Sequence, residues 1–230
     1  MLVNTKAQTT AAKPYFYSLF SPVTDVSLSA TKKTGNVCEI VKQPNFFFQG
    51  AYIAKSWGVS SPSTFKTGWA NRSTFSCKFN SITTSGGGFV IFRVYNGNSD
   101  RLKIQQTHTG TPTCSFFYTE YDTTTQTTAD KGISLGSIGT FPAEWQVELY
   151  EPVVLATTAF GVQRVYFDWK VSLNGTVQAE SLTGATRNYN QAIFELTDFC
   201  NGSEVSIGAT AESFTLEIDD VLINVNSSCP

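Results

Sequence analysis

The residues able to do acid–base, nucleophilic or metal chemistry are few. The chain holds one histidine, His108, and five cysteines at wide spacings. Any Ser-His-Asp or Cys-His mechanism must therefore use His108, and a metal site with two histidine ligands cannot exist. The absence of a Cys-x-x-Cys pair excludes a structural zinc site and a thioredoxin-like motif. Cys77 and Cys114 lie in apolar runs and are expected to be small buried hydrophobic side chains. A disulfide between Cys38 and Cys229 requires that the first and last strands pair.

Two adjacent carboxylates, Asp219 and Asp220, interrupt an otherwise apolar run. A buried carboxylate without a partner is strongly unfavourable, so at least one of them must be hydrogen-bonded or bind a metal ion. Calcium is the metal that suits a chain rich in oxygen ligands and poor in histidine. Because neighbouring residues of a strand point to opposite faces, we expect only one of the two carboxylates to be a ligand.

The composition describes a folded, weakly charged domain. Hydrophobic residues make up 41% of the 230 residues and charged residues 15%, with a formal net charge of −2. This hydrophobic fraction fills a core. The scattered lysines and arginines form no basic stripe, which argues against a nucleic-acid partner. No apolar run is long enough for a membrane span, and the first residues lack the apolar segment and cleavage motif of a secretion signal.

The elements that position these residues are predicted to be β strands. Residues 1–35 are polar with one aromatic run and indicate an N-terminal arm, and residues 36–230 form the β domain. Short alternating runs rich in Val, Ile, Phe, Tyr and Thr predict about a dozen strands in two antiparallel sheets. The polar run 122–130 is predicted to be a loop, and Asn174-Gly175 predicts a two-residue hairpin turn. The predicted strands span 37–41, 46–54, 74–80, 89–95, 102–108, 113–121, 144–150, 163–173, 176–182, 191–196, 204–209 and 214–225.

Alternation in two of these strands separates a buried face from a wet face. Val165, Phe167 and Trp169 share one face of their strand, and Tyr166 lies on the other. The run 144–150 repeats this pattern with Trp145 on the buried side. The two runs are therefore expected to be neighbours in one antiparallel sheet.

Three segments near the end of the sequence, 165–177, 204–209 and 213–223, share the motifs of a known fold. Their Asn-Gly, Ile-Gly and Ile-Asp-Asp-Val motifs resemble the late strands of the concanavalin A-like jelly roll of the laminin G-like kind. The resemblance implies an all-β, two-sheet antiparallel jelly-roll sandwich, in which a terminal-strand aspartate, here Asp219 or Asp220, often helps to hold structural calcium. The sequence departs from laminin G domains at Glu217, where they usually carry a disulfide cysteine. Carbohydrate-binding modules with this sandwich end in a similar strand.

Short motifs in the sequence resemble, in part, those of two enzyme families of the concanavalin A-like fold. Glu217-Ile218-Asp219 begins the Glu-x-Asp-x-x-Glu pattern of retaining glucanases, but Leu222 stands where the second Glu is required. Arg72, Gln106-Thr107-His108 and Tyr189 resemble, in order, elements of the alginate lyase family. That resemblance implies that Gln106 neutralises a uronate carboxylate, His108 accepts the proton and Tyr189 acts as the acid. Thr74 stands where that family has Glu, and a solvent-exposed strand-end role for His108 is the alternative.

A binding surface requires fewer specific residues than a catalytic site does. Sugar-binding faces combine flat aromatic rings with planar polar groups. We therefore predict a ligand surface formed by polar and aromatic residues on the outer faces of the central strands: Arg93, Tyr95, Gln106, His108, Tyr118, Glu120, Tyr150 and Tyr166.

These observations favour a non-catalytic, lectin-like β-sandwich that binds glycan or polysaccharide, or attaches to a surface, and acts outside the cell or on a particle surface. Structural calcium at Asp219 or Asp220 belongs to this interpretation. One alternative is a structural subunit of a virion, tail or surface filament, which forms a homo-oligomer or larger assembly. The other is a polysaccharide lyase acting on uronate polymers. Aromatic residues gathered on one sheet face favour ligand binding, whereas aromatic residues packed across subunits favour assembly.

Overall fold

The computed structural model describes residues 21–22, 28–35, 37–43, 50–56, 73–86, 88–96, 99–108, 110–122, 124–137, 141–154, 161–181, 189–196, 199, 203–211 and 213–224. Nearly all regular structure in these residues is β strand, and no helix among them is long and apolar enough to cross a membrane. The strands are β1 (Ser21–Pro22), β2 (Leu28–Lys32), β3 (Cys38–Lys42), β4 (Gly50–Ser56), β5 (Ser73–Ser85), β6 (Phe89–Asn96), β7 (Ser99–Thr107), β8 (Thr113–Asp122), β9 (Thr127–Ser137), β10 (Ala143–Val154), β11 (Arg164–Leu173), β12 (Thr176–Glu180), β13 (Gln191–Glu195), β14 (Ser203–Thr210) and β15 (Ser213–Asn224).

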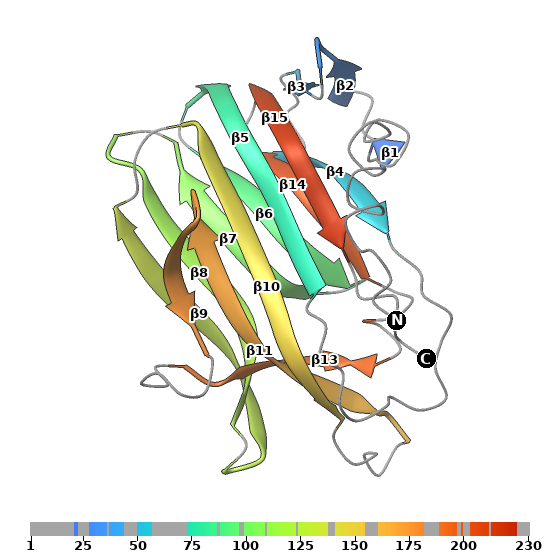
Figure 1. The fold of residues 1–230 in the computed structure, drawn as a ribbon. Coiled ribbons are helices and arrows are strands. Elements are labelled where there is room, and N and C mark those ends of the chain that lie inside the picture. Colours follow the sequence, from blue (N-terminus) through green and yellow to red (C-terminus); the bar gives the residue numbers. More distant parts are fainter. Residues whose placement is uncertain are drawn as a thin grey trace.

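The strands form two facing layers. Hydrogen bonding runs in the order β1-β4-β14-β6-β7-β8-β13-β11-β10-β5-β15-β3-β2, with β9 on β8 and β12 on β11. Each of these strand pairs is antiparallel. In Figure 1 β5, β10 and β15 lie in front of β6, β7 and β14. Strand β13 pairs with both β8 and β11 and so joins the layers. The predicted all-β, antiparallel jelly-roll sandwich is confirmed.

The predicted N-terminal arm is described only in part. Residues 1–20 lie outside the described residues. Strand β2, which belongs to the range predicted as the arm, pairs with β3, and β1 pairs with β4. The described part of residues 1–35 therefore contributes strands to the sheet.

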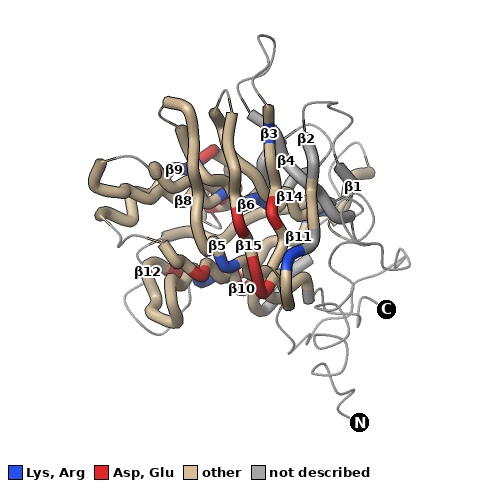
Figure 2. Tube along the Cα trace, turned by 90° about the horizontal axis from the view of Figure 1, so that it is seen from above, with Lys and Arg blue, Asp and Glu red and all other residues tan. Residues whose placement is uncertain are grey.

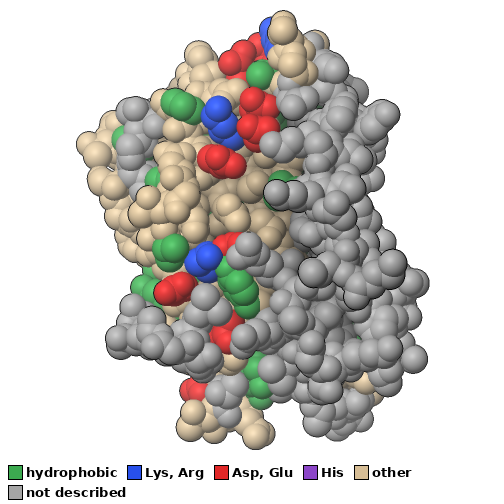
Figure 3. Space-filling view, viewed as in Figure 1, with side chains coloured by type: hydrophobic (Ala, Val, Ile, Leu, Met, Phe, Trp, Pro, Cys, Tyr) green, Lys and Arg blue, Asp and Glu red, His purple; other side chains and the backbone are tan. Residues whose placement is uncertain are grey.

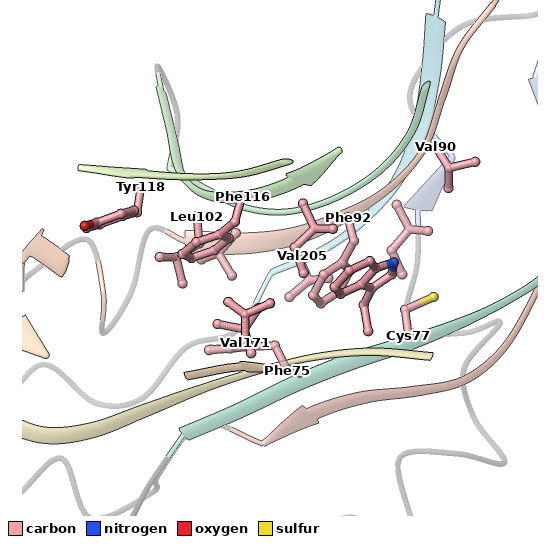
Figure 4. Packing of buried hydrophobic residues seen from close by; sticks show 14 of the residues in the cluster. Phe75, Cys77, Val90, Phe92, Leu102, Phe116, Tyr118, Val171 and Val205 are labelled. Atoms are coloured by element: carbon pink, nitrogen blue, oxygen red, sulfur yellow. The ribbon is translucent and has the colours of Figure 1, made fainter. Parts of the chain in front are cut away.

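The core lies between the layers and follows strand alternation. Trp145 of β10 and Trp169 of β11 are fully buried, as their alternating runs predict, and these two strands pair directly. Figure 4 shows Phe75 and Val171 of one layer facing Phe92 of the other. The largest fully buried side chains from the two layers are Trp145, Trp169, Lys42, Phe75, Phe79, Phe92, Phe116, Phe167 and Phe194, with Phe199 and Ile40.

The cysteines behave as predicted in two cases and differ in a third. Cys77 and Cys114 are free and buried, and burial raises the pKa of each thiol. Cys38 is also a free, buried thiol, with a pKa that burial raises to about 11, so the suggested disulfide to Cys229 is wrong. Cys229 lies outside the described residues. The strand pairing that this disulfide required does exist, because β3 pairs with β15.

Two predicted turns had different outcomes. Asn174 and Gly175 have φ values of 48° and 78°, so the hairpin between β11 and β12 is confirmed. The run 122–130, predicted to be a loop, instead contributes its second half to β9, which pairs with β8 along its length. Strand β9 is exposed over most of its residues, so it needs no apolar pattern to form, and alternation could not reveal it.

Candidate functional site

A lateral row of side-chain positions crosses five neighbouring strands of one layer. The register aligns Ser206 with Arg93, Arg93 with Lys103, Lys103 with Phe117, and Phe117 with Gly132. These positions alternate with core residues such as Val205, Phe92 and Phe116, so their side chains point away from the core, but Ser206 is itself only 1% exposed and does not reach the surface. We call this set, Ser206, Arg93, Lys103, Phe117 and Gly132, the Phe117 row.

The ring of Phe117 lies between a glycine and a cation. A Cβ atom on Gly132 would lie 3.1 and 3.2 Å from Cε1 and Cδ1 of Phe117, so the missing side chain leaves space that the ring occupies. From β7, Nζ of Lys103 lies 4.8 Å from the ring centroid. Phe117, Lys103 and Arg93 are all half-buried. The row thus presents one flat apolar ring beside two cationic side chains that donate hydrogen bonds.

Further polar groups surround the ring on the same face. Gln105 aligns with Ser115, and Ser115 with Ser134, in the next row along the strands. On the other side Thr119 donates a hydrogen bond to Asp130 Oδ1 at 3.1 Å. The layer that carries Phe92, Leu102 and Phe116 is visibly curved in Figure 4. Hydroxyl and amide groups therefore frame the aromatic ring on a curved sheet.

The predicted ligand residues of this layer divide between the outer face and the core. Arg93 lies on the outer face, and the side chain of Tyr95 is outside the described residues. Gln106 and Tyr118 are 1% and 2% exposed and point into the core, so their predicted outward position is wrong. Gln106 follows Leu102 and Ile104 at intervals of two residues, so strand alternation places it on the same buried face although its side chain is polar.

Tyr118 and Glu120 form a pair at the inner side of β8. The Tyr118 hydroxyl donates to Glu120 Oε2 at 3.2 Å, and the Tyr118 ring lies 4.8 Å from that of Trp169. Burial raises the pKa of the Tyr118 phenol well above its usual value. The Tyr118 hydroxyl and the Glu120 carboxylate are therefore bonded to each other within the fold and have a structural role.

The lyase interpretation places Gln106 and His108 on an open face, and the structure does not. Nε1 of Trp145 donates to Gln106 Oε1 at 3.0 Å inside the core. His108 follows the end of β7, with its Nδ1 3.5 Å from Thr84 Oγ1. Tyr189 packs against Trp169 with ring centroids 5.7 Å apart, and Arg72 lies outside the described residues. Gln106 therefore cannot touch a polymer lying on either outer face.

Tyr150 and Tyr166 lie on the outer face of the opposite layer, where an ion pair dominates. Nζ of Lys170 lies 2.6 Å from Glu148 Oε2, and the Tyr150 hydroxyl donates to the same oxygen at 2.7 Å. The Tyr166 ring stacks on that of Tyr121 at 5.2 Å. Figure 3 shows basic and acidic atoms side by side on this face. The predicted ligand residues are thus divided between two opposite surfaces and the core.

Asp219 and Asp220 stand at an irregularity of β15. The register against β5 shifts between Asp219 and Leu222, and Asp220 has a φ of 48°. The Asp219 carboxylate accepts the backbone N–H of Asp220 at 2.7 Å, and both residues are half-buried. Figure 2 shows acidic positions on β15, and Asp219 aligns with Lys78 of β5. The carboxylate of Asp219 is therefore satisfied by a hydrogen bond, and the shift breaks the regular alternation that was expected to separate the pair.

No group of three or more His, Cys, Asp or Glu side chains within the described ranges is arranged to hold a metal ion. A calcium site at Asp219 or Asp220 stays a prediction that would need further oxygen ligands, such as backbone carbonyls.

A hollow of about 420 Å³ lies where β3, β5 and β15 meet. Its lining includes the hydroxyl-bearing residues Thr83, Ser85, Ser213 and Thr215, and the Ser85 and Ser213 oxygens are 2.8 Å apart. None of the ligand residues predicted from the sequence lines it. It contains hydroxyl groups but no exposed aromatic ring, so the Phe117 row is the better candidate for ligand recognition.

The single histidine predicts a pH-dependent stability. Burial lowers the pKa of His108 below its ordinary value of 6.5. The folded state thus favours the neutral imidazole. The stability that results is fully present above pH 6.5 and is lost as the pH falls from 6.5 toward the pKa of His108 in the folded state. Urea unfolding of the wild type should show a loss of stability between pH 7.5 and 5.5 that a His108→Gln variant lacks. Parallel curves for the two proteins would contradict this prediction.

Comparison with known proteins gives structural likeness only. No family model matches the chain, and no curated protein matches it. LamAcat from Zobellia galactanivorans is 12% identical, covering 85% of this chain and 80% of that chain, with a TM-score of 0.42. An alginate lyase from Alteromonas sp. 272 is 9% identical, covering 90% and 93%, with a TM-score of 0.41. The carbohydrate-binding module CBM66 from Bacillus subtilis is 8% identical, covering 90% and 96%, with a TM-score of 0.37. At these values the likeness says nothing about the ligand or activity of this chain.

Proposed function

We propose that this chain is a non-catalytic, carbohydrate-binding β-sandwich and that the Phe117 row is its binding surface. The observation that carries the proposal is the Phe117 ring, which packs against Gly132 on an outer sheet face, with the Lys103 ammonium over one side of the ring. An aromatic ring held in this way can contact the C–H face of a pyranose. Neighbouring Lys, Arg, Gln and Ser side chains can then bind its hydroxyl groups.

The same surface offers little for catalysis. Glycoside hydrolysis uses two carboxyl groups on opposite sides of the scissile bond. The described part of the row holds no carboxylate, and nearby Asp130 already accepts a hydrogen bond from Thr119. The one histidine of the chain lies at the inner end of β7, beside Thr84. Binding without bond cleavage is therefore the function that this geometry supports best.

The proposal predicts a loss of binding when the ring is removed or displaced. Phe117→Ala should weaken glycan binding roughly tenfold, because the stacking contact is lost. Gly132→Val should have a similar effect, since its Cβ would enter the space that the ring occupies. Affinity electrophoresis in gels containing laminarin, alginate or xylan would first identify a retarding polysaccharide, and titration calorimetry would then compare the variants.

Ser137→Ala is the matched control, because Ser137 is exposed at the far end of the same strand as Gly132. Wild-type protein that no polysaccharide retards would refute the function. Retardation that Phe117→Ala and Gly132→Val leave unchanged would refute the surface and keep the function.

A further inference from the structure

A second polar arrangement lies inside the sandwich, where β7 ends. Gln106 and His108 are two residues apart, so their side chains leave the same face of the chain with Cα atoms about 6.6 Å apart. Gln106 is 1% exposed, and Nε2 of each side chain is buried without a hydrogen-bond partner in the described structure. Buried polar atoms are nearly always paired, so two orphans on neighbouring side chains indicate a missing partner.

The orientation of the Gln106 amide is determined by its neighbour. The indole Nε1 of Trp145 is a donor only, so the amide atom that it contacts at 3.0 Å must be the oxygen. The amide nitrogen then points elsewhere with two hydrogens to donate. Gln106 Nε2 is therefore a buried donor that lacks an acceptor.

The tautomer of His108 follows from Thr84. The Thr84 hydroxyl has one hydrogen and donates it to the carbonyl oxygen of Gly86 at 2.8 Å. Toward His108 Nδ1, 3.5 Å away, it can only accept, so Nδ1 carries the imidazole hydrogen. In a neutral imidazole Nε2 is then an acceptor, and here it is buried without a donor.

Gly88 is the neighbour that allows the imidazole to sit where it does. A Cβ atom at this position would lie 3.1 Å from His108 Nε2 and in collision with the backbone oxygen of Thr210. The absence of a side chain at Gly88 therefore lets the Thr210 backbone lie close to the imidazole, at the end of the sandwich.

We propose that one ordered water molecule binds between Gln106 and His108, accepting a hydrogen bond from Gln106 Nε2 and donating one to His108 Nε2. A donor without an acceptor and an acceptor without a donor are complementary to the two roles of a water molecule. The site is independent of the Phe117 row and explains the Gln-x-His spacing without catalysis.

The test uses the wild-type protein, so no variant has to fold. Because the chain has one histidine, ¹⁵N-histidine labelling gives a single imidazole spectrum, and we expect Nδ1 protonated and Nε2 unprotonated at pH 7.5. We also expect cross-peaks between the Gln106 side-chain amide hydrogens and a long-lived water in laboratory-frame and rotating-frame Overhauser spectra. The Gln178 amide, which donates to Thr176 O at an exposed site, is the internal control and should show only fast solvent contact.

Any of three results would overturn the proposal. A hydrogen on His108 Nε2 would remove the acceptor that the water needs. Gln106 amide hydrogens without a long-lived water contact would show that the site is dry. If the same signals change only when an oligosaccharide is added, the bound hydroxyl belongs to that ligand, and the water assignment is wrong.

Discussion

Trp169→Ala is expected to lower the free energy of unfolding by about 4 kcal/mol, within the range for truncation of a buried aromatic side chain. Trp169 is fully buried, and its ring lies 4.9 Å from Phe116 and 4.8 Å from Tyr118. Its Nε1 also donates to the backbone oxygen of Asn190 at 2.9 Å. The alanine variant would leave a cavity between the two layers and an unpaired carbonyl.

Urea unfolding followed by far-ultraviolet circular dichroism measures this loss. Trp169→Phe should cost about half as much, because a smaller ring still fills part of the space. Val177→Ala is the control, since Val177 is 46% exposed and its truncation should change stability by less than about 0.5 kcal/mol. A loss below about 1 kcal/mol for the alanine variant would contradict the packing described here.

Lys170→Met is expected to destabilise the protein by about 3 kcal/mol, because it leaves the buried carboxylate of Glu148 without its cation. Side chains of Glu148 and Lys170 are 5% and 21% exposed. The Tyr150 hydroxyl would still donate to Glu148 Oε2, but a neutral hydroxyl does not balance the charge. Removing one member of a buried pair is more harmful than removing both, since an uncompensated charge stays behind.

A double-mutant cycle separates this effect from lost packing. The double variant Glu148→Gln/Lys170→Met should be more stable than Lys170→Met alone, since no unpaired charge remains. The comparison uses urea unfolding of the wild type, both single variants and the double variant at one pH. Strictly additive losses would indicate that the pair contributes through packing and not through charge.

Strand alternation predicted the core wherever the two faces of a strand differ in character. Along 144–150 of β10 and 164–173 of β11 apolar and more polar residues alternate, and Trp145 and Trp169 lie inside as expected. In β8 the run Phe116-Phe117-Tyr118 is aromatic on both faces, so residue type could not indicate which ring faces outward. The outward ring is Phe117, and the prediction named Tyr118.

The candidate site depended on a strand that the pattern did not reveal. Phe117 lies over Gly132 of β9, an exposed strand whose first half has the composition of a loop. A glycine in such a run indicates nothing by itself. Only the register of β8 with β9 places it beneath an aromatic ring.

The sequence by itself determined the single histidine, the exclusion of thiolate zinc chemistry, the β class and the buried faces of the regular strands. These follow from composition and from a period of two, which are local properties. The tertiary structure decided that Gln106 meets Trp145, that Glu148 meets Lys170 and that Asp219 accepts the N–H of its neighbour. Such contacts join distant strands or depend on a register shift, and both are set by the packing of the two layers together.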